Sequence, residues 1–151
     1  MSILRNLFNF DVPRDELINI YVLYIRSVVE FSSTVWSSSL TEEDSIDIER
    51  IQKIALRIIF KEDYTSYEDA LSLARLPSLK ERRELLSLNF ALKCTKNEKT
   101  ASMFSLAKRN VNTRIKEVFE VTFCRTELFK NSAIPHMQRQ LNENCLKSRM
   151  N

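Results

Sequence analysis

The sequence contains no glycine among its 151 residues. Phosphate loops of the GxxxxGK type and dinucleotide turns of the GxGxxG type both need glycine, because the backbone approaches the ligand closely there. Both kinds of site are therefore excluded, and so are tight hairpin turns of the Asn-Gly type. Proline is also scarce, with three residues. A chain of this composition is most easily built from helices, and we predict an all-α fold.

Histidine and cysteine are too few for the common catalytic and metal sites. Cys94, Cys124 and Cys145 match no zinc spacing, and His136 is the single histidine of the sequence. We expect free thiols in a reducing compartment, an exposed structural histidine, no metal and no cofactor. No small-residue cleavage site follows the N-terminal apolar residues, so we expect an intracellular protein of the cytoplasm or nucleus.

The longest apolar run, "LINIYVLYIRSVVEFSSTVW" at residues 17–36, has the length of a membrane span. Arg26 lies at its midpoint and Glu30 follows four residues later. A charge at that depth costs about 2.5–3.5 kcal/mol, which offsets the gain from several aliphatic side chains. We therefore predict a helix from Pro13 that is buried in protein on most faces, in which Arg26 and Glu30 neutralise each other.

Three further helices are predicted by capping signals. Thr41 with the acidic residues after it begins a helix to about Phe60, supported on its solvent side by Glu49 and Lys53. Ser66 begins a short helix that ends before Pro77. Ser78 begins a helix to about Thr95, with three leucines expected to face inward. These are Leu85, Leu88 and Leu92.

The sequence pattern of regular secondary structure becomes weaker after residue 106. A last short helix is expected over 100–106, a short strand or extended segment over 118–123, another helical turn or two near Pro135, and a frayed tail over 143–151. We thus predict a bundle of four to five helices over residues 1–106 and an irregular or extended basic C-terminal arm over 107–151. Acidic pairs and triplets sit at predicted helix starts, where capping explains them without a metal ion.

Positive charge is concentrated in the last third of the chain. Residues 96–151 hold eleven Lys and Arg against five Asp and Glu, whereas residues 1–60 hold six against nine. The basic residues alternate with Phe119, Phe123 and Phe129, a combination typical of nucleic-acid binding. The alternatives are a solvated surface and phenylalanines that dock the arm on the helical body. The predicted phosphate-binding residues are Lys108, Arg109, Arg114, Lys116 and Arg125, with Lys130 beside them.

Four blocks in this order resemble a known family. They are "LINIYVLYIRSVVEFSSTVW", "IERIQKIALRIIF", "YEDALSLARLPSLKERREL" and "FCRTELFKNSAIPHMQRQLN". Together they resemble the region after the polymerase core in reverse transcriptases of jockey-like non-LTR retrotransposons. The resemblance covers about residues 4–142 and implies a thumb-like helical segment that holds the template–primer duplex of RNA and DNA.

The resemblance implies no catalysis by this chain alone. The family's catalytic aspartates and its Tyr-x-Asp-Asp turn lie in the palm, and no such turn occurs here. We therefore expect a non-enzymatic fragment of an RNA-directed DNA polymerase whose missing partner is the palm, with apolar surface left open and possible self-association. Two alternatives remain: a helical protein–protein interaction module, and decayed element sequence with no selected role.

Overall fold

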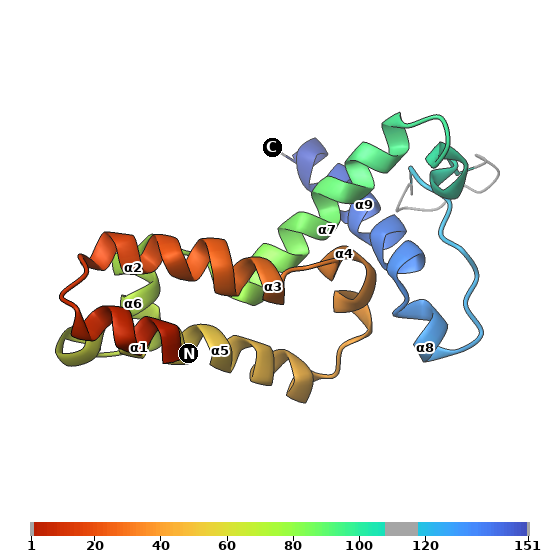
Figure 1. Ribbon diagram of the computed structural model, residues 1–151. Helices are drawn as coiled ribbons and strands as arrows, with labels where there is room; N and C mark the ends of the chain where they lie inside the picture. The colour runs from red at the N-terminus through yellow and green to blue at the C-terminus, as the bar shows by residue number, and fades with distance from the viewer. Residues whose placement is uncertain (1, 108–117, 151) are drawn as a thin grey trace. The chain divides into compact units, whose positions relative to one another are not determined.

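The computed structural model describes residues 2–107 and 118–150, and within them the protein is all-α, as predicted (Figure 1). Three short 3₁₀ turns (Ser37–Ser39, Lys61–Asp63 and Ala101–Phe104) join the helices. No strand occurs in the described ranges, where residues 118–123 are extended and form one isolated bridge, between Leu106 and Phe119. The α-helices are α1 (Ser2–Asn9), α2 (Arg14–Ile20), α3 (Ser27–Val29), α4 (Ser33–Trp36), α5 (Glu42–Phe60), α6 (Tyr67–Ala74), α7 (Leu79–Lys96), α8 (Glu127–Lys130) and α9 (Ala133–Met150), with a π-helix, Tyr21–Arg26, between α2 and α3.

Contacts divide the chain into two compact units. Unit 1 comprises Met1–Ser32 and Leu40–Arg83, and unit 2 comprises Ser33–Ser39 and Glu84–Asn151. The division therefore falls inside α7, and α4 together with the turn Ser37–Ser39 belongs to unit 2, although the chain before and after this stretch belongs to unit 1. The predicted boundary at residue 106 stays a prediction, and the expected bundle of four to five helices is not confirmed, since α1 was not foreseen.

The predicted N-caps are confirmed. The Thr41 hydroxyl accepts from the Asp44 amide at 3.1 Å, and the Asp44 carboxylate accepts from the Thr41 amide at 3.2 Å. Ser66 caps α6 through the Asp69 amide, and Ser78 exchanges hydrogen bonds with Glu81 at the start of α7. Each pair satisfies backbone donors that a helix leaves open. The hydroxyl and then the amide of Thr41 donate to the Asp44 carboxylate and lower its pKa, and the hydroxyls of Ser66 and Thr65 do the same for the pKa of Asp69.

The helix expected to be buried on most faces is buried on one side only. Leu17 and Tyr21 lie in the core of unit 1, whereas Tyr24, Val28 and Phe31 are 71–77% exposed. The helix also ends at Val29, and Ser32 has a positive φ of 52°. The prediction of burial on most faces is therefore wrong for these residues. Their exposure agrees with the separate expectation that apolar surface lies open in a segment without its palm.

A charged cluster closes the C-terminal end of this helix. Arg26 and Glu30 approach to 3.7 Å, as predicted, and both side chains are nearly buried. Arg82 of α7 pairs with the same carboxylate at 2.6 Å. Two guanidinium groups thus surround one carboxylate, and this arrangement lets unit 1 bury charge in the middle of an apolar sequence.

Helix α5 supplies the buried polar groups of unit 1. Gln52 is fully buried; its side chain accepts from Tyr21 Oη at 2.8 Å and donates to the Pro77 carbonyl at 2.9 Å. Glu49 was expected to pair with Lys53 on the solvent side, and it does not. Its carboxylate accepts from the Tyr67 hydroxyl and from the first amides of α7, where the helix dipole favours a negative charge. Burial raises the pKa of Tyr21 and of Tyr67, so both phenols stay protonated and donate.

The core of unit 2 joins α7 to α9. Ala91, Cys94, Met137 and Leu141 are buried there, with Phe104 of the preceding turn. The inward leucines were predicted wrongly in part: Leu85 is 54% and Leu92 36% exposed, whereas Leu88 packs against this core. The buried row of α7 repeats every four residues instead, through Leu79, Arg83, Ser87 and Ala91. Helix α9 extends to Met150, so the expected frayed tail is helical over most of its length.

Candidate nucleic-acid interface

One of the five predicted phosphate-binding residues lies in the described chain. Arg125 is exposed in the turn before α8. Lys108, Arg109, Arg114 and Lys116 lie outside the described residues. The site can therefore be built from residues 118–132, which contain Arg125 and the three phenylalanines, and from α9.

Two side-chain amides of α9 fasten the extended segment 118–122. Asn142 Oδ1 accepts from the amides of Val118 (3.0 Å) and Phe119 (2.9 Å), and Asn142 Nδ2 donates to the Phe119 carbonyl at 3.0 Å. Gln138, one turn earlier, accepts from the Thr122 amide and donates to the Met103 carbonyl, both at 2.8 Å. Residues 105–107 pair with this segment through two backbone hydrogen bonds, and the two amides satisfy backbone groups that this bridge leaves without a partner.

Sequence reasoning missed Gln138 and Asn142. Both are at least 93% buried on α9, and they are spaced four residues apart beside apolar positions. This spacing places two amides on one helix face toward the core. It was the available signal, because a buried amide needs several hydrogen-bond partners.

Helix α8 orders the residues that follow Arg125. The Thr126 hydroxyl accepts from the Phe129 amide at 3.2 Å and begins the helix. Lys130, expected among the free cations of the arm, pairs with Glu127 at 3.1 Å. Arg139 of α9 donates to the Lys130 carbonyl at 2.6 Å. The predicted irregular arm is thus replaced here by a capped turn of helix tied to α9.

The three phenylalanines have different environments. Phe119 packs against the core of unit 2, as the docking alternative expected. Phe123 is 82% and Phe129 46% exposed. An exposed aromatic face can stack on an unpaired base, with a gain of about 1–3 kcal/mol. Two of the three rings are therefore available for contact with a ligand.

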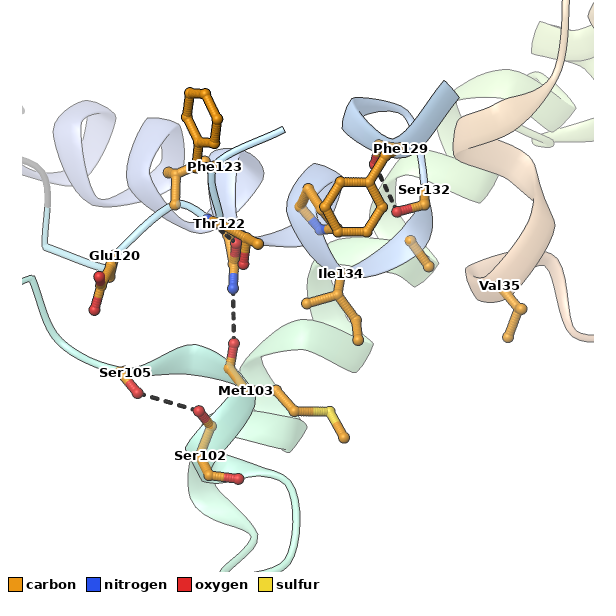
Figure 2. Close-up of a pocket in the computed structure, with 14 residues that line it drawn as sticks. Val35, Ser102, Met103, Ser105, Glu120, Thr122, Phe123, Phe129, Ser132 and Ile134 are labelled. Atoms are coloured by element: carbon orange, nitrogen blue, oxygen red, sulfur yellow. Dashed lines mark hydrogen bonds between the residues drawn. The ribbon is translucent and has the colours of Figure 1, made fainter. Parts of the chain in front are cut away.

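An open cavity of about 850 Å³ lies between the extended segment and α9 (Figure 2). Phe123 and Phe129 line it together with Ile134 and Met103, and Glu120 contributes a carboxylate. The lining is mainly apolar, which suits a flat aromatic group more than a phosphate. Gln138 lines the same cavity with its amide already engaged by protein partners.

The described part of this region is electrically neutral. Residues 118–132 contain Arg125 and Lys130 against Glu120 and Glu127. The stretch 108–117 contains four Lys and Arg against Glu117. Any attraction of the arm for a polyanion therefore depends mainly on those four cations together with α9.

The titratable side chains of the described ranges do not gather into a metal site. No group of three or more His, Cys, Asp or Glu is placed to hold a metal ion in residues 2–107 and 118–150. All three cysteines are free thiols, as predicted. His136 is half-buried instead of exposed, and burial, followed by Arg139, lowers its pKa. Asp63, expected at a helix start, follows the end of α5 and pairs with Arg14.

Comparisons with models of protein families, with curated proteins and with solved structures find no match for this chain. Across the helices of the described ranges, none combines the length and the apolar character that crossing a membrane requires.

Proposed function

We propose that this chain is the thumb-like segment of a retrotransposon reverse transcriptase, and that it contacts the backbone of a template–primer duplex. The contacts are made by Lys108, Arg109, Arg114, Lys116 and Arg125. The segment keeps the duplex in place while a palm domain, supplied by another part of the polymerase, performs the chemistry. It acts within the cell, in the cytoplasm or nucleus, and it has no catalytic residues of its own.

The observation that carries this proposal is the arrangement around Arg125. Its turn is anchored on both sides, by the amide clamp of Gln138 and Asn142 and by the Thr126 cap. Arg125 and the Phe123 ring are exposed on this anchored turn. Because the backbone that carries the cation and the ring is already ordered, binding costs less conformational entropy, which favours contact with a nucleic acid.

Binding to an RNA–DNA hybrid at several salt concentrations tests the proposal. A fluorescein-labelled hybrid of 20 base pairs is titrated with the full chain and with an arm variant in which the five basic residues are glutamine. We expect log K of the wild type to fall with log salt by about 0.7–0.9 per phosphate contact. The arm variant should bind at least tenfold more weakly and have a smaller slope. Equal affinity of the two proteins would refute the proposal.

A protein–protein interaction module remains the second candidate because of the open apolar surface of unit 1. Tyr24 and Val28 share one helix face, Phe31 follows the end of the helix at Val29, and all three are exposed. Contiguous apolar surface of this kind marks a partner site or causes self-association. Light scattering of the full chain tests this function: serine at the three positions should abolish self-association, and a wild-type monomer across 5–100 µM would argue against it.

A further inference from the structure

Charge is segregated along α5. Residues 42–49 contain five Asp and Glu and no Lys or Arg, whereas residues 50–61 contain four Lys and Arg and no Asp or Glu. The net charge of residues 1–60 is negative, so it does not reveal that the second half of α5 is basic. Its four cations are Arg50, Lys53, Arg57 and Lys61.

Two of these cations lie on one side of the helix, and a third follows its end. Lys53 and Arg57 are spaced four residues apart on α5, and Lys61 is the residue after its last turn, with φ of 43°; the backbone rises about 12 Å from the first to the last. All three are exposed. We call these residues the α5 basic face.

Each cation of the α5 basic face lies over an aromatic ring. Lys53 Nζ is 5.0 Å from the centre of the Tyr67 ring, and the Arg57 guanidinium is 5.4 Å from that of Tyr64. Lys61 Nζ is 5.2 Å from the centre of the Phe8 ring. The rings restrict these otherwise flexible side chains at about 0.5–1 kcal/mol per contact, so the charges are held in place before any ligand arrives.

The α5 basic face is also not neutralised by carboxylates. Within residues 2–107 and 118–150, its three cations form no ion pair, whereas Arg50 pairs with Asp47 at 2.9 Å and Arg14 with Asp63 at 2.5 Å. Glu49, the nearest acidic residue on the same helix, faces the start of α7 instead. In the described ranges, the face therefore presents positive charge that no carboxylate neutralises at ion-pair distance.

The helix dipole explains part of this pattern. Cations stabilise the C-terminal end of a helix, but the effect is confined to about the last turn. Arg57 and Lys61 lie within that turn or just after it, and Lys53 lies about two turns before the end of α5 at Phe60. Stabilisation of the dipole therefore does not account for Lys53.

We propose that the α5 basic face binds the phosphate backbone of double-stranded nucleic acid. Over about 12 Å a duplex carries about seven phosphates, so three fixed cations can each meet one. The aromatic rings already pack beneath the cations, so they cannot stack on bases. Binding is therefore independent of sequence and favours a duplex over a single strand. The site lies in unit 1 and does not depend on the C-terminal arm.

The experiment uses the full chain and two variants of equal net charge. The face variant is K53Q/R57Q/K61Q, and the control is K93Q/K96Q/K99Q, which removes three exposed cations at and just after the end of α7. Affinity for a labelled 20-base-pair DNA duplex and for the matching single strand is measured between 50 and 300 mM salt. We expect the face variant to bind the duplex at least tenfold more weakly, with the salt slope reduced by about two to three. The control should change affinity less than twofold.

Further measurements distinguish binding by the α5 basic face from misfolding and from binding by the arm. The variant K53R/R57K/K61R, which keeps the charges, should bind like wild type, and a urea unfolding midpoint of the face variant equal to that of wild type shows that its loss of affinity is not caused by misfolding. The arm variant should keep the contribution of the α5 basic face to the salt slope. Equal losses in the face variant and the control, a loss for single strands alone, or a loss for vesicles of phosphatidylserine with duplex affinity unchanged would each overturn the proposal.

Discussion

Replacing Asn142 with leucine should destabilise unit 2. The side chain makes three hydrogen bonds to the segment 118–119, and it is 93% buried. At a net value of about 0.5–1.5 kcal/mol per bond, the total is about 1.5–4.5 kcal/mol. Val118 and Phe119 are only half-buried, so water can satisfy part of what is lost. We expect a loss of about 2 kcal/mol in the free energy of unfolding.

Urea unfolding monitored by tryptophan fluorescence measures this loss of stability in unit 2. The sequence has a single tryptophan, Trp36, which lies on α4, and α4 contacts α9 within unit 2. Hydrogen exchange of the Val118 and Phe119 amides should accelerate in the same variant, because both amides lose their acceptor.

Asn144→Leu provides the matched control. Position 144 lies about 200° around α9 from position 142, so the same change there should alter stability by less than about 0.5 kcal/mol. A loss below about 0.5 kcal/mol for Asn142→Leu, or equal losses for both variants, would show that the amide clamp does not stabilise the unit.

Two other perturbations test unit 1 and the histidine. Gln52→Leu leaves the Tyr21 hydroxyl and the Pro77 carbonyl without their buried partner. The free energy of unfolding, measured with urea and circular dichroism, should fall by about 2–4 kcal/mol. Tyr21→Phe should cost less in the Gln52→Leu variant than in wild type, and additive losses would refute the coupling of the two residues. Because burial lowers the pKa of folded His136 below the ordinary 6.5, the unfolded chain binds the proton more tightly, so stability should fall as pH drops below about 6.5. His136→Gln should flatten the stability profile between about pH 7.5 and 5, and an unchanged slope would contradict this reasoning.

The predictions that rested on neighbouring residues were the most reliable ones. Thr41, Ser66 and Ser78 mark the starts of three helices because a cap is made by residues three apart, with no contribution from the rest of the fold. The break before Pro77 follows from the same kind of local chemistry, and so does the lack of strands in the described ranges of a chain without glycine. The pair of Arg26 and Glu30 could be predicted for the same reason.

Other features were set by contacts between distant residues. Arg75 ends α6 in a left-handed conformation with φ of 53°, a position where glycine is usual. Helix boundaries in this chain could therefore not be read from glycine. Glu49 has the spacing of a surface ion pair with Lys53, yet the start of α7, thirty residues later, turns its carboxylate inward.

The amino-acid sequence by itself determined that the protein is helical, where α2, α5, α6 and α7 begin, and that its last third is basic, because these properties depend on composition and on neighbours within one helical turn. Tertiary structure alone decided which side of each helix is buried, so that Tyr24 is exposed and Gln52 is not. It also decided that Lys53 and its neighbours lie over aromatic rings and that Gln138 and Asn142 hold the extended segment. These arrangements require contacts across 7 to 53 residues of chain, as between Arg57 and Tyr64 or Lys61 and Phe8, and no local pattern encodes which partner a side chain will meet.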